Sequence, residues 1–280
     1  MSLVNRVGRP IARVVRNYAY RGVSIAEQVV SAGAGELMPP AHLRHLYYRV
    51  WSRDAYRKAC AGAAAELKSR GLKPEHRLLD IGAGIGNLAV GLGGYLQVGY
   101  DGVEINAEAV AWCGRDITAR YPHFRFHHAD IFSQAYNPRG TATASTWRFP
   151  FDDQQFDFVF LGSVFTHLMP ADVANYLREI GRVLRPGGTC VASHFLLDAP
   201  ARAGIAAGTP FMSFGFDDES GLARLHSLRV PEAAVAIDEA FILDAYRRAG
   251  LTLTNVRRGR WWDGRSDDQD ILTSAREAGG

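Results

Sequence analysis

The sequence predicts an α/β fold: a doubly wound, mostly parallel sheet of seven strands with an antiparallel last strand and helices on both faces. Three observations predict it. Short apolar runs alternate with amphipathic helical segments through most of the chain. A glycine-rich turn joins the first apolar run directly to a helix. The last two apolar runs have no helix between them, which favours an antiparallel pair.

The composition is that of one large domain with a sizeable core. The chain has 280 residues, 47% of them hydrophobic, and its 32 basic and 29 acidic residues leave a net charge of +3. This balance gives no argument for a nucleic-acid partner. Cys60, Cys113 and Cys190 are too widely spaced for a disulfide framework or a zinc site. With no secretory signal and no apolar run of membrane-spanning length, a cytoplasmic location is expected, and the oligomeric state is left open.

Residues 1–40 are predicted to form a basic amphipathic helix and a linker. Apolar residues from Val4 to Tyr18 recur at helical spacing, with arginines on the opposite face. Such a helix either lies on an anionic membrane surface or docks its apolar face on the main domain. We favour docking, because the stretch lacks a Trp or Phe anchor. Two helices, Ala41–Trp51 and Ala55–Arg70, are expected next.

The stretch Leu78–Asn87 is predicted to be a buried strand, a glycine-rich turn and the start of a helix. Gly82, Gly84 and Gly86 allow backbone conformations that other residues avoid, and they let a ligand approach the chain closely. The helix that follows presents unpaired N–H groups and the positive end of its dipole. The turn therefore predicts a site for a nucleotide-like ligand.

The spacing of the glycines favours S-adenosylmethionine (SAM) over a dinucleotide. A dinucleotide fingerprint, G-x-G-x-x-G, would place glycine where the chain has Asn87. With Asp80 two residues before Gly82, the pattern instead resembles motif I of the class I SAM-dependent methyltransferases. SAM has no pyrophosphate, and an acid at the strand end suits its cationic groups. The resemblance implies cofactor contacts from Asp80, Gly82, Ala83, Gly84, Gly86 and Asn87.

The next two predicted strands each end in an acid. Glu104 closes the strand expected at Val98–Ile105, where a carboxylate can accept both ribose hydroxyls. Asp130 follows the strand expected at Phe124–Ala129. In the methyltransferases an acid at that place hydrogen-bonds the adenine amino group. The resemblance therefore implies ribose and adenine contacts from Glu104, Ile105, Asp130 and Ile131.

The segment Phe149–Phe160 resembles the lead into strand four of small-molecule methyltransferases. That strand, Phe158–Leu161, delivers Ser163 and Val164 to the expected cofactor site and His167 to the expected methyl position. Methyl transfer to an alcohol or phenol depends on positioning and on a proton acceptor. An imidazole, with an ordinary pKa of about 6.5, is a usable base at neutral pH.

The identity of the base has alternatives. His167 is the first candidate, but it would equally pack or cap the helix that follows. His194, in the fifth strand, is the second candidate, with a core histidine as the competing interpretation. Asp198 is the third. The spacing of carboxylates assembles no metal site, so no metal is expected.

The remaining elements complete the expected sheet. In chain order they are a helix at Ala171–Leu184, a turn at Arg185–Gly188 that matches the family's L-x-P-G-G, a strand at Cys190–Leu196, a helix at Glu239–Ala249, and strands at Leu251–Arg257 and Asp270–Ser274. An insert rich in proline and phenylalanine lies at about 198–236. In this family that position often supplies a lid over the substrate, and a plain structural excursion is the alternative.

The resemblance covers residues 41–280 and implies a seven-stranded, Rossmann-like methyltransferase domain. The region before the first strand commonly folds over the cofactor in this family. The candidates for a cavity wall are therefore Arg44, His45, Tyr47, Tyr48 and Trp51, with ordinary helix packing as the alternative. The expected activity is SAM-dependent methylation of a small molecule or sugar at a hydroxyl oxygen, as in natural-product or glycan pathways. The alternatives are a methyltransferase of protein or RNA, and a SAM-binding protein without turnover.

Overall fold

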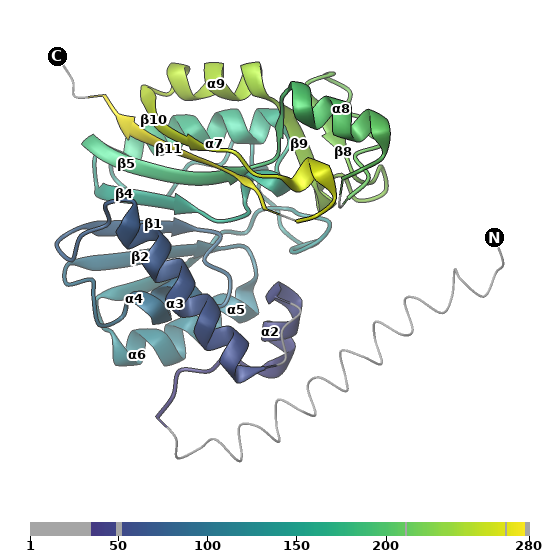
Figure 1. Ribbon diagram of the computed structural model, residues 1–280. Helices are drawn as coiled ribbons and strands as arrows, with labels where there is room; N and C mark the ends of the chain where they lie inside the picture. The colour runs from purple at the N-terminus through teal and green to yellow at the C-terminus, as the bar shows by residue number, and fades with distance from the viewer. Residues whose placement is uncertain (1–34, 49–51, 211, 267, 278–280) are drawn as a thin grey trace, which may run out of the picture.

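The computed structural model describes residues 35–48, 52–210, 212–266 and 268–277, so the helix expected near the N-terminus lies outside the described residues. Its main layer is a seven-stranded sheet in the order β10-β11-β5-β4-β1-β2-β3 (Figure 1). The last strand, β11, runs antiparallel to both β5 and β10, whereas β5, β4, β1, β2 and β3 pair in parallel. The expected fold class is confirmed.

The bounds of most elements agree with the sequence pattern within a few residues. The strands are β1 (Arg77–Ile81), β2 (Gly99–Glu104), β3 (Phe124–His128), β4 (Phe156–Leu161), β5 (Leu184–His194), β10 (Leu251–Arg257) and β11 (Asp270–Arg276). The helices around them are α2 (Ala41–Tyr48), α3 (Arg53–Ser69), α4 (Asn87–Leu92), α5 (Ala107–Trp112), α6 (Thr118–Arg120), α7 (Pro170–Val183) and α9 (Glu239–Arg248). Within the described ranges no helix is both long and apolar enough to cross a membrane.

The central strand β1 is buried on both faces of the sheet, and successive side chains belong to different apolar clusters. Leu78 shares a cluster with Leu67 of α3 and Leu88 of α4. Leu79 shares the other cluster with Leu177 of α7 and with residues of α9. Because side chains alternate across a strand, burial on both faces requires the continuous apolar run that the sequence shows here.

Two local features differ from the expected elements. The single helix expected over Ala107–Arg120 is interrupted by a π-helical turn at Cys113–Ile117. In that turn Ile117 and Cys113 face the glycine turn, since a Cβ added at Gly86 would lie 2.4 Å from Ile117 Cδ1. The expected turn at residues 185–188 is a large bulge inside β5, where the pairing of β5 with β4 shifts register.

The insert forms a second sheet, in the order β6-β9-β8-β7. Its elements are β6 (Leu196–Leu197), α8 (Ala199–Ala207), β7 (Phe216–Asp217), β8 (Ala223–Leu225), the 3₁₀ turn η3 (Pro231–Ala233) and β9 (Val235–Asp238). Leu225 and Val235 belong to the same apolar cluster as Leu79 of the main sheet. Phe195, Phe214 and Trp261 form a further cluster behind it. The insert is therefore a packed extension of the domain.

Candidate active site

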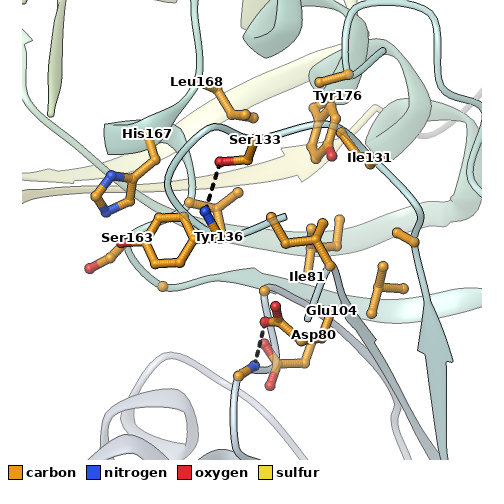
Figure 2. A pocket seen from close by; sticks show the side chains of 18 of the residues that line it. Asp80, Ile81, Glu104, Ile131, Ser133, Tyr136, Ser163, His167, Leu168 and Tyr176 are labelled. Atoms are coloured by element: carbon orange, nitrogen blue, oxygen red, sulfur yellow. Dashed lines mark hydrogen bonds between the residues drawn. The ribbon is translucent and has the colours of Figure 1, made fainter. Parts of the chain in front are cut away.

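A cavity of about 700 Å³ lies at the carboxyl ends of the central strands (Figure 2). This edge is where the strand order reverses between β1 and β4, the usual ligand position in doubly wound sheets. Its lining includes the predicted residues Asp80, Gly82, Gly84, Asn87, Glu104, Ile105, Ile131, Ser163, Val164 and His167. Side chains far apart in the sequence are thus brought to one edge of the sheet.

The glycine turn after β1 is held in a conformation that requires glycine. The φ angles of Gly82, Gly84 and Gly86 are +77°, +54° and +69°. A Cβ at Gly82 would also lie 2.4 Å from Val164 Cγ2. The amides of Gly82 and Ala83 both donate to the carbonyl of Val103, at 2.8 and 3.0 Å. Gly82 and Gly84 face the cavity, whereas Ala83 and Gly86 support the turn from outside its lining.

Glu104 is a fixed, buried acceptor at the end of β2. Its two carboxylate oxygens accept N–H bonds from Gly84 at 2.9 Å and from Asn106 at 2.8 Å, and the side chain lies beside the glycine turn (Figure 2). Burial raises the pKa of this carboxyl, while the two amides act against the shift. Each oxygen keeps a further lone pair, so the group can still accept hydroxyl donors from a ligand.

Asp80 lies deeper, at the end of β1. It is 2% exposed, and the hydroxyl of Tyr100 donates to its Oδ2 at 2.5 Å. Burial, aided by the charge of Glu104, raises the pKa of Asp80 to about 7 against the opposing hydrogen bond from Tyr100. The carboxyl therefore titrates near neutral pH and is poised to respond to a cation in the cavity.

The end of β4 is pinned against the glycine turn. Ser163 has a φ of +57°, which is uncommon for a residue with a side chain. Its amide donates to Ser193 Oγ at 2.7 Å and its hydroxyl to Gln269 Oε1 at 3.1 Å, and these bonds hold the conformation. The next residue, Val164, then packs against Gly82. These contacts fix the distance between the β1 and β4 sides of the cavity.

His167 lies in the 3₁₀ turn η2 (Phe165–His167) and faces the cavity. Its Nδ1 is 2.8 Å from the carbonyl oxygen of Glu232, in the insert. A carbonyl only accepts, so Nδ1 carries the proton and a neutral ring keeps its lone pair on Nε2. Burial lowers the pKa of His167, which favours the neutral ring at pH 7. The ring also contacts Tyr136 edge to face, with centroids 5.5 Å apart.

Several cavity residues were not among the predicted site residues. Tyr136 comes from the loop after β3, Asp172 from the first turn of α7 and Glu232 from η3. Nothing in their spacing marks them, because they meet only when the loop, the helix and the insert are folded together. Tyr47 of α2 does line the cavity, and its ring lies about 3.1 Å from the position of a Cβ at Gly84.

Besides Ala83 and Gly86, three predicted residues, Asp130, His194 and Asp198, are absent from the cavity lining. Asp130 is exposed, and its carboxylate accepts bonds from Thr141 Oγ1 at 2.7 Å and Asn137 Nδ2 at 3.3 Å. His194 is 2% exposed, its Nε2 lies 3.0 Å from the Tyr246 hydroxyl, and burial lowers its pKa to about 3. This is the geometry of a core histidine.

Asp198 has a structural role as the N-cap of α8. Its side chain accepts from the amide of Ala201 at 2.9 Å, a contact that satisfies an otherwise unpaired helix donor. In the part of the chain that the structure describes, no three His, Cys, Asp or Glu side chains are grouped as a metal site would need.

Comparison with known proteins agrees with this geometry. A model of the methyltransferase domain matches residues 79–192. The uncharacterized methyltransferase YcgJ of Bacillus subtilis is 27% identical over 137 residues, which span 48% of this chain and 47% of that protein. The match thus spans about half the length of this relative.

Two solved structures share the fold. The PH0226 protein of Pyrococcus horikoshii superposes with a TM-score of 0.55 and 14% identity over 82% of this chain and 98% of that one. A 1,6-didemethyltoxoflavin-N1-methyltransferase of Burkholderia thailandensis, solved with bound 1,6-didemethyltoxoflavin and S-adenosylhomocysteine, superposes with a TM-score of 0.50 and 19% identity over 93% of this chain and 90% of that one. The glycine turn, Glu104 and the end of β4 all lie within residues 79–192, the part of the chain that is similar to a methyltransferase domain.

Proposed function

We propose that this chain is an enzyme that transfers the methyl group of SAM to a hydroxyl oxygen of a small molecule or sugar. One observation carries the choice of oxygen: a neutral imidazole with its free nitrogen at the acceptor end of the cavity. His167 lines that end, and its Nδ1 is occupied by the Glu232 carbonyl. A hydroxyl needs such a proton acceptor as its oxygen attacks carbon.

The residues at the other end of the cavity fit SAM. Gly82 and Gly84 line the cavity with backbone alone, and Val164 and Tyr47 pack where their Cβ atoms would stand. Glu104 keeps lone pairs for the ribose hydroxyls, and Asp80 offers a carboxyl that a cationic amino group would ionise. Ile105 and Ile131 add apolar surface. When bound, SAM supplies an electrophilic methyl group on a sulfonium leaving group.

The chain's own residues then have distinct tasks. The pinned ends of β1 and β4 hold the two halves of the cavity at a set distance, which favours an in-line approach. His167 takes the hydroxyl proton at Nε2, and the Glu232 carbonyl steadies the resulting imidazolium through Nδ1–H. Asp172 and Glu232, which also line this end, are suited to accept further hydroxyl donors from a sugar-like acceptor.

The first experiment tests cofactor use. Isothermal titration of the full chain with SAM and with S-adenosylhomocysteine should show binding of both ligands. If neither ligand binds, the proposed function is refuted. Binding without turnover of any acceptor in a panel of sugars and phenols would favour a SAM-binding protein that is not an enzyme.

The second experiment tests the base. With an acceptor found in that panel, His167→Ala should lower kcat by about 10²–10⁴-fold while cofactor affinity stays unchanged. His76→Ala, at the amino end of β1 and away from the cavity, is the matched control. Transfer from SAM with a ¹³C-labelled methyl group, read by NMR, distinguishes a methoxy product from an N-methyl product. A normal rate in His167→Ala would exclude His167 as the base.

A further inference from the structure

The loop that follows β3, residues 130–142, is closed on itself, and we call it the Tyr136 loop. The amides of Thr141 and Ala142 both donate to the carbonyl of Asp130 at 2.9 Å, and Phe132 donates to Ala142. Further in, Ser133 and Asn137 exchange two backbone bonds of 3.1 and 2.9 Å. A loop tied at its base and at its tip presents its side chains from a defined position.

The side chain of Asp130 is part of this closure. Its Oδ2 accepts the hydroxyl of Thr141 at 2.7 Å, and its Oδ1 accepts the amide of Asn137 at 3.3 Å. The same Asn137 amide donates to the Ile131 carbonyl at 3.1 Å. These bonds lower the pKa of Asp130, so the carboxylate is charged at neutral pH. Each of its oxygens thus accepts a bond within the loop, and the carboxylate is exposed to solvent and absent from the cavity lining.

The tip of the loop reaches His167. The amide of Tyr136 donates to Ser133 Oγ at 3.3 Å, and its ring meets the His167 ring at an interplanar angle of 74° (Figure 2). The imidazole is also held by the Glu232 carbonyl, which lies 2.8 Å from its Nδ1. The candidate base therefore contacts both the loop after β3 and the insert after β5, two segments that lie far apart in the sequence.

We propose that Tyr136 is a positioning residue for His167, and that Asp130 acts through the loop to hold Tyr136 there rather than by contact with the adenine. Insofar as it concerns catalysis, the proposal rests on the proposed function. The ring of Tyr136 limits the rotation of the imidazole and keeps water from it. Asp130 sets where that ring stands, because the carboxylate ties both flanks of the loop.

The test uses a readout that needs neither cofactor nor acceptor. The pKa of His167 is measured by NMR in the full chain, assigned by its loss in His167→Ala. In Tyr136→Ala water reaches the ring, so its pKa should rise toward the ordinary value of about 6.5, since burial lowers it in the wild type. Glu232, whose charge acts on the ring, and Asp172, which lines the same cavity, are unchanged in these variants. Tyr136→Phe, which keeps the edge contact, should restore the wild-type titration.

The role of Asp130 is separated by two further measurements. Asp130→Ala and Thr141→Val should each shift the pKa of His167 in the direction of Tyr136→Ala, and the double variant Asp130→Ala/Tyr136→Ala should shift no further than Tyr136→Ala alone. S-adenosylhomocysteine affinity should change less than twofold. Asp152→Ala, which removes another exposed carboxylate, is the control.

An unchanged His167 titration in Tyr136→Ala or Asp130→Ala, or a tenfold loss of cofactor affinity in Asp130→Ala, would overturn the proposal. Failure of the wild type to bind cofactor would instead overturn the proposed function.

Discussion

Gly82 is a residue at which the glycine turn tolerates little change. It combines a φ of +77° with a Val164 methyl 2.4 Å from any added Cβ. Gly187 also has a positive φ, +78°, but a Cβ added there would have no atom within 4 Å. We expect Gly187→Ala to lower the free energy of unfolding by about 1 kcal/mol through backbone strain alone.

Gly82→Ala should add a steric term of about 1–3 kcal/mol to that strain and weaken S-adenosylhomocysteine binding at least tenfold. Urea denaturation and isothermal titration on both variants measure the two effects. If both variants lose the same stability and Gly82→Ala binds S-adenosylhomocysteine normally, then Val164 moves aside and the present shape of the turn is not required for binding.

Asp80 makes a pH dependence testable at the same scale. Its pKa is about 7 when folded, against an ordinary value of 3.8, so between about pH 4 and pH 7 the folded chain holds a proton that the unfolded chain has lost. Its contribution to stability therefore falls as pH rises through that window, by up to about 1.4 kcal/mol per pH unit. Asp80→Asn should remove this slope, as measured by urea denaturation at several pH values. A variant with the wild-type slope would show that other groups cause it.

At the scale of elements, α7 is joined to the segment before β4 by a buried ion pair. Glu179, 1% exposed, accepts the amide of Phe149 at 3.0 Å and Arg182 Nη2 at 2.6 Å. Arg182 also donates to the carbonyls of Phe149 and Phe151. The segment before β4 thus supplies the backbone groups that fix this ion pair in place.

Arg182→Met should lower the free energy of unfolding by about 3–5 kcal/mol, because it leaves Glu179 buried without its main partner. Adding Glu179→Gln should recover much of the loss. Arg178→Met is the control, since that arginine is 65% exposed and should change stability by less than about 1 kcal/mol. A small effect of Arg182→Met in urea denaturation would mean that water reaches Glu179 and replaces the arginine.

The main sheet was predictable because its central strand β1 is buried on both faces and therefore leaves an apolar run, as at Leu78 and Leu79. The second sheet was not predictable in the same way. Its strands are two to four residues long, and β6 pairs with β9 some forty residues later, so no local pattern announces them. Helix patterns also carry no sign of the π turn at Cys113–Ile117.

At the scale of the whole molecule, the insert shares its core with the main sheet. Leu225 of β8 and Val235 of β9 belong to the apolar cluster of Leu79 and Val159. We therefore expect native-state hydrogen exchange to give the β9 amides an opening free energy within about 1 kcal/mol of the β4 amides. Opening of β9 that is easier by several kcal/mol would identify the insert as a unit that moves on its own, as a lid does.

The site was predictable where one strand end and one turn define it, and not where tertiary contacts do. The glycine turn, Glu104 and His167 follow from the order of strands and stand at the cavity. The sequence does not reveal that the Asp130 carboxylate is taken up by its own loop, or that Tyr136 meets His167. Both depend on how a loop without regular structure closes, which no periodicity encodes.

The partner of His167 Nδ1 is a main-chain carbonyl, and that has an evolutionary consequence. Point mutation at position 232 replaces a side chain at the acceptor end while the carbonyl stays, since every amino acid provides one. Descendants of this chain can therefore drift toward new acceptors by single substitutions there without losing the orientation of the imidazole. Deletion of the insert would instead remove both the side chain at position 232 and the carbonyl that orients the imidazole.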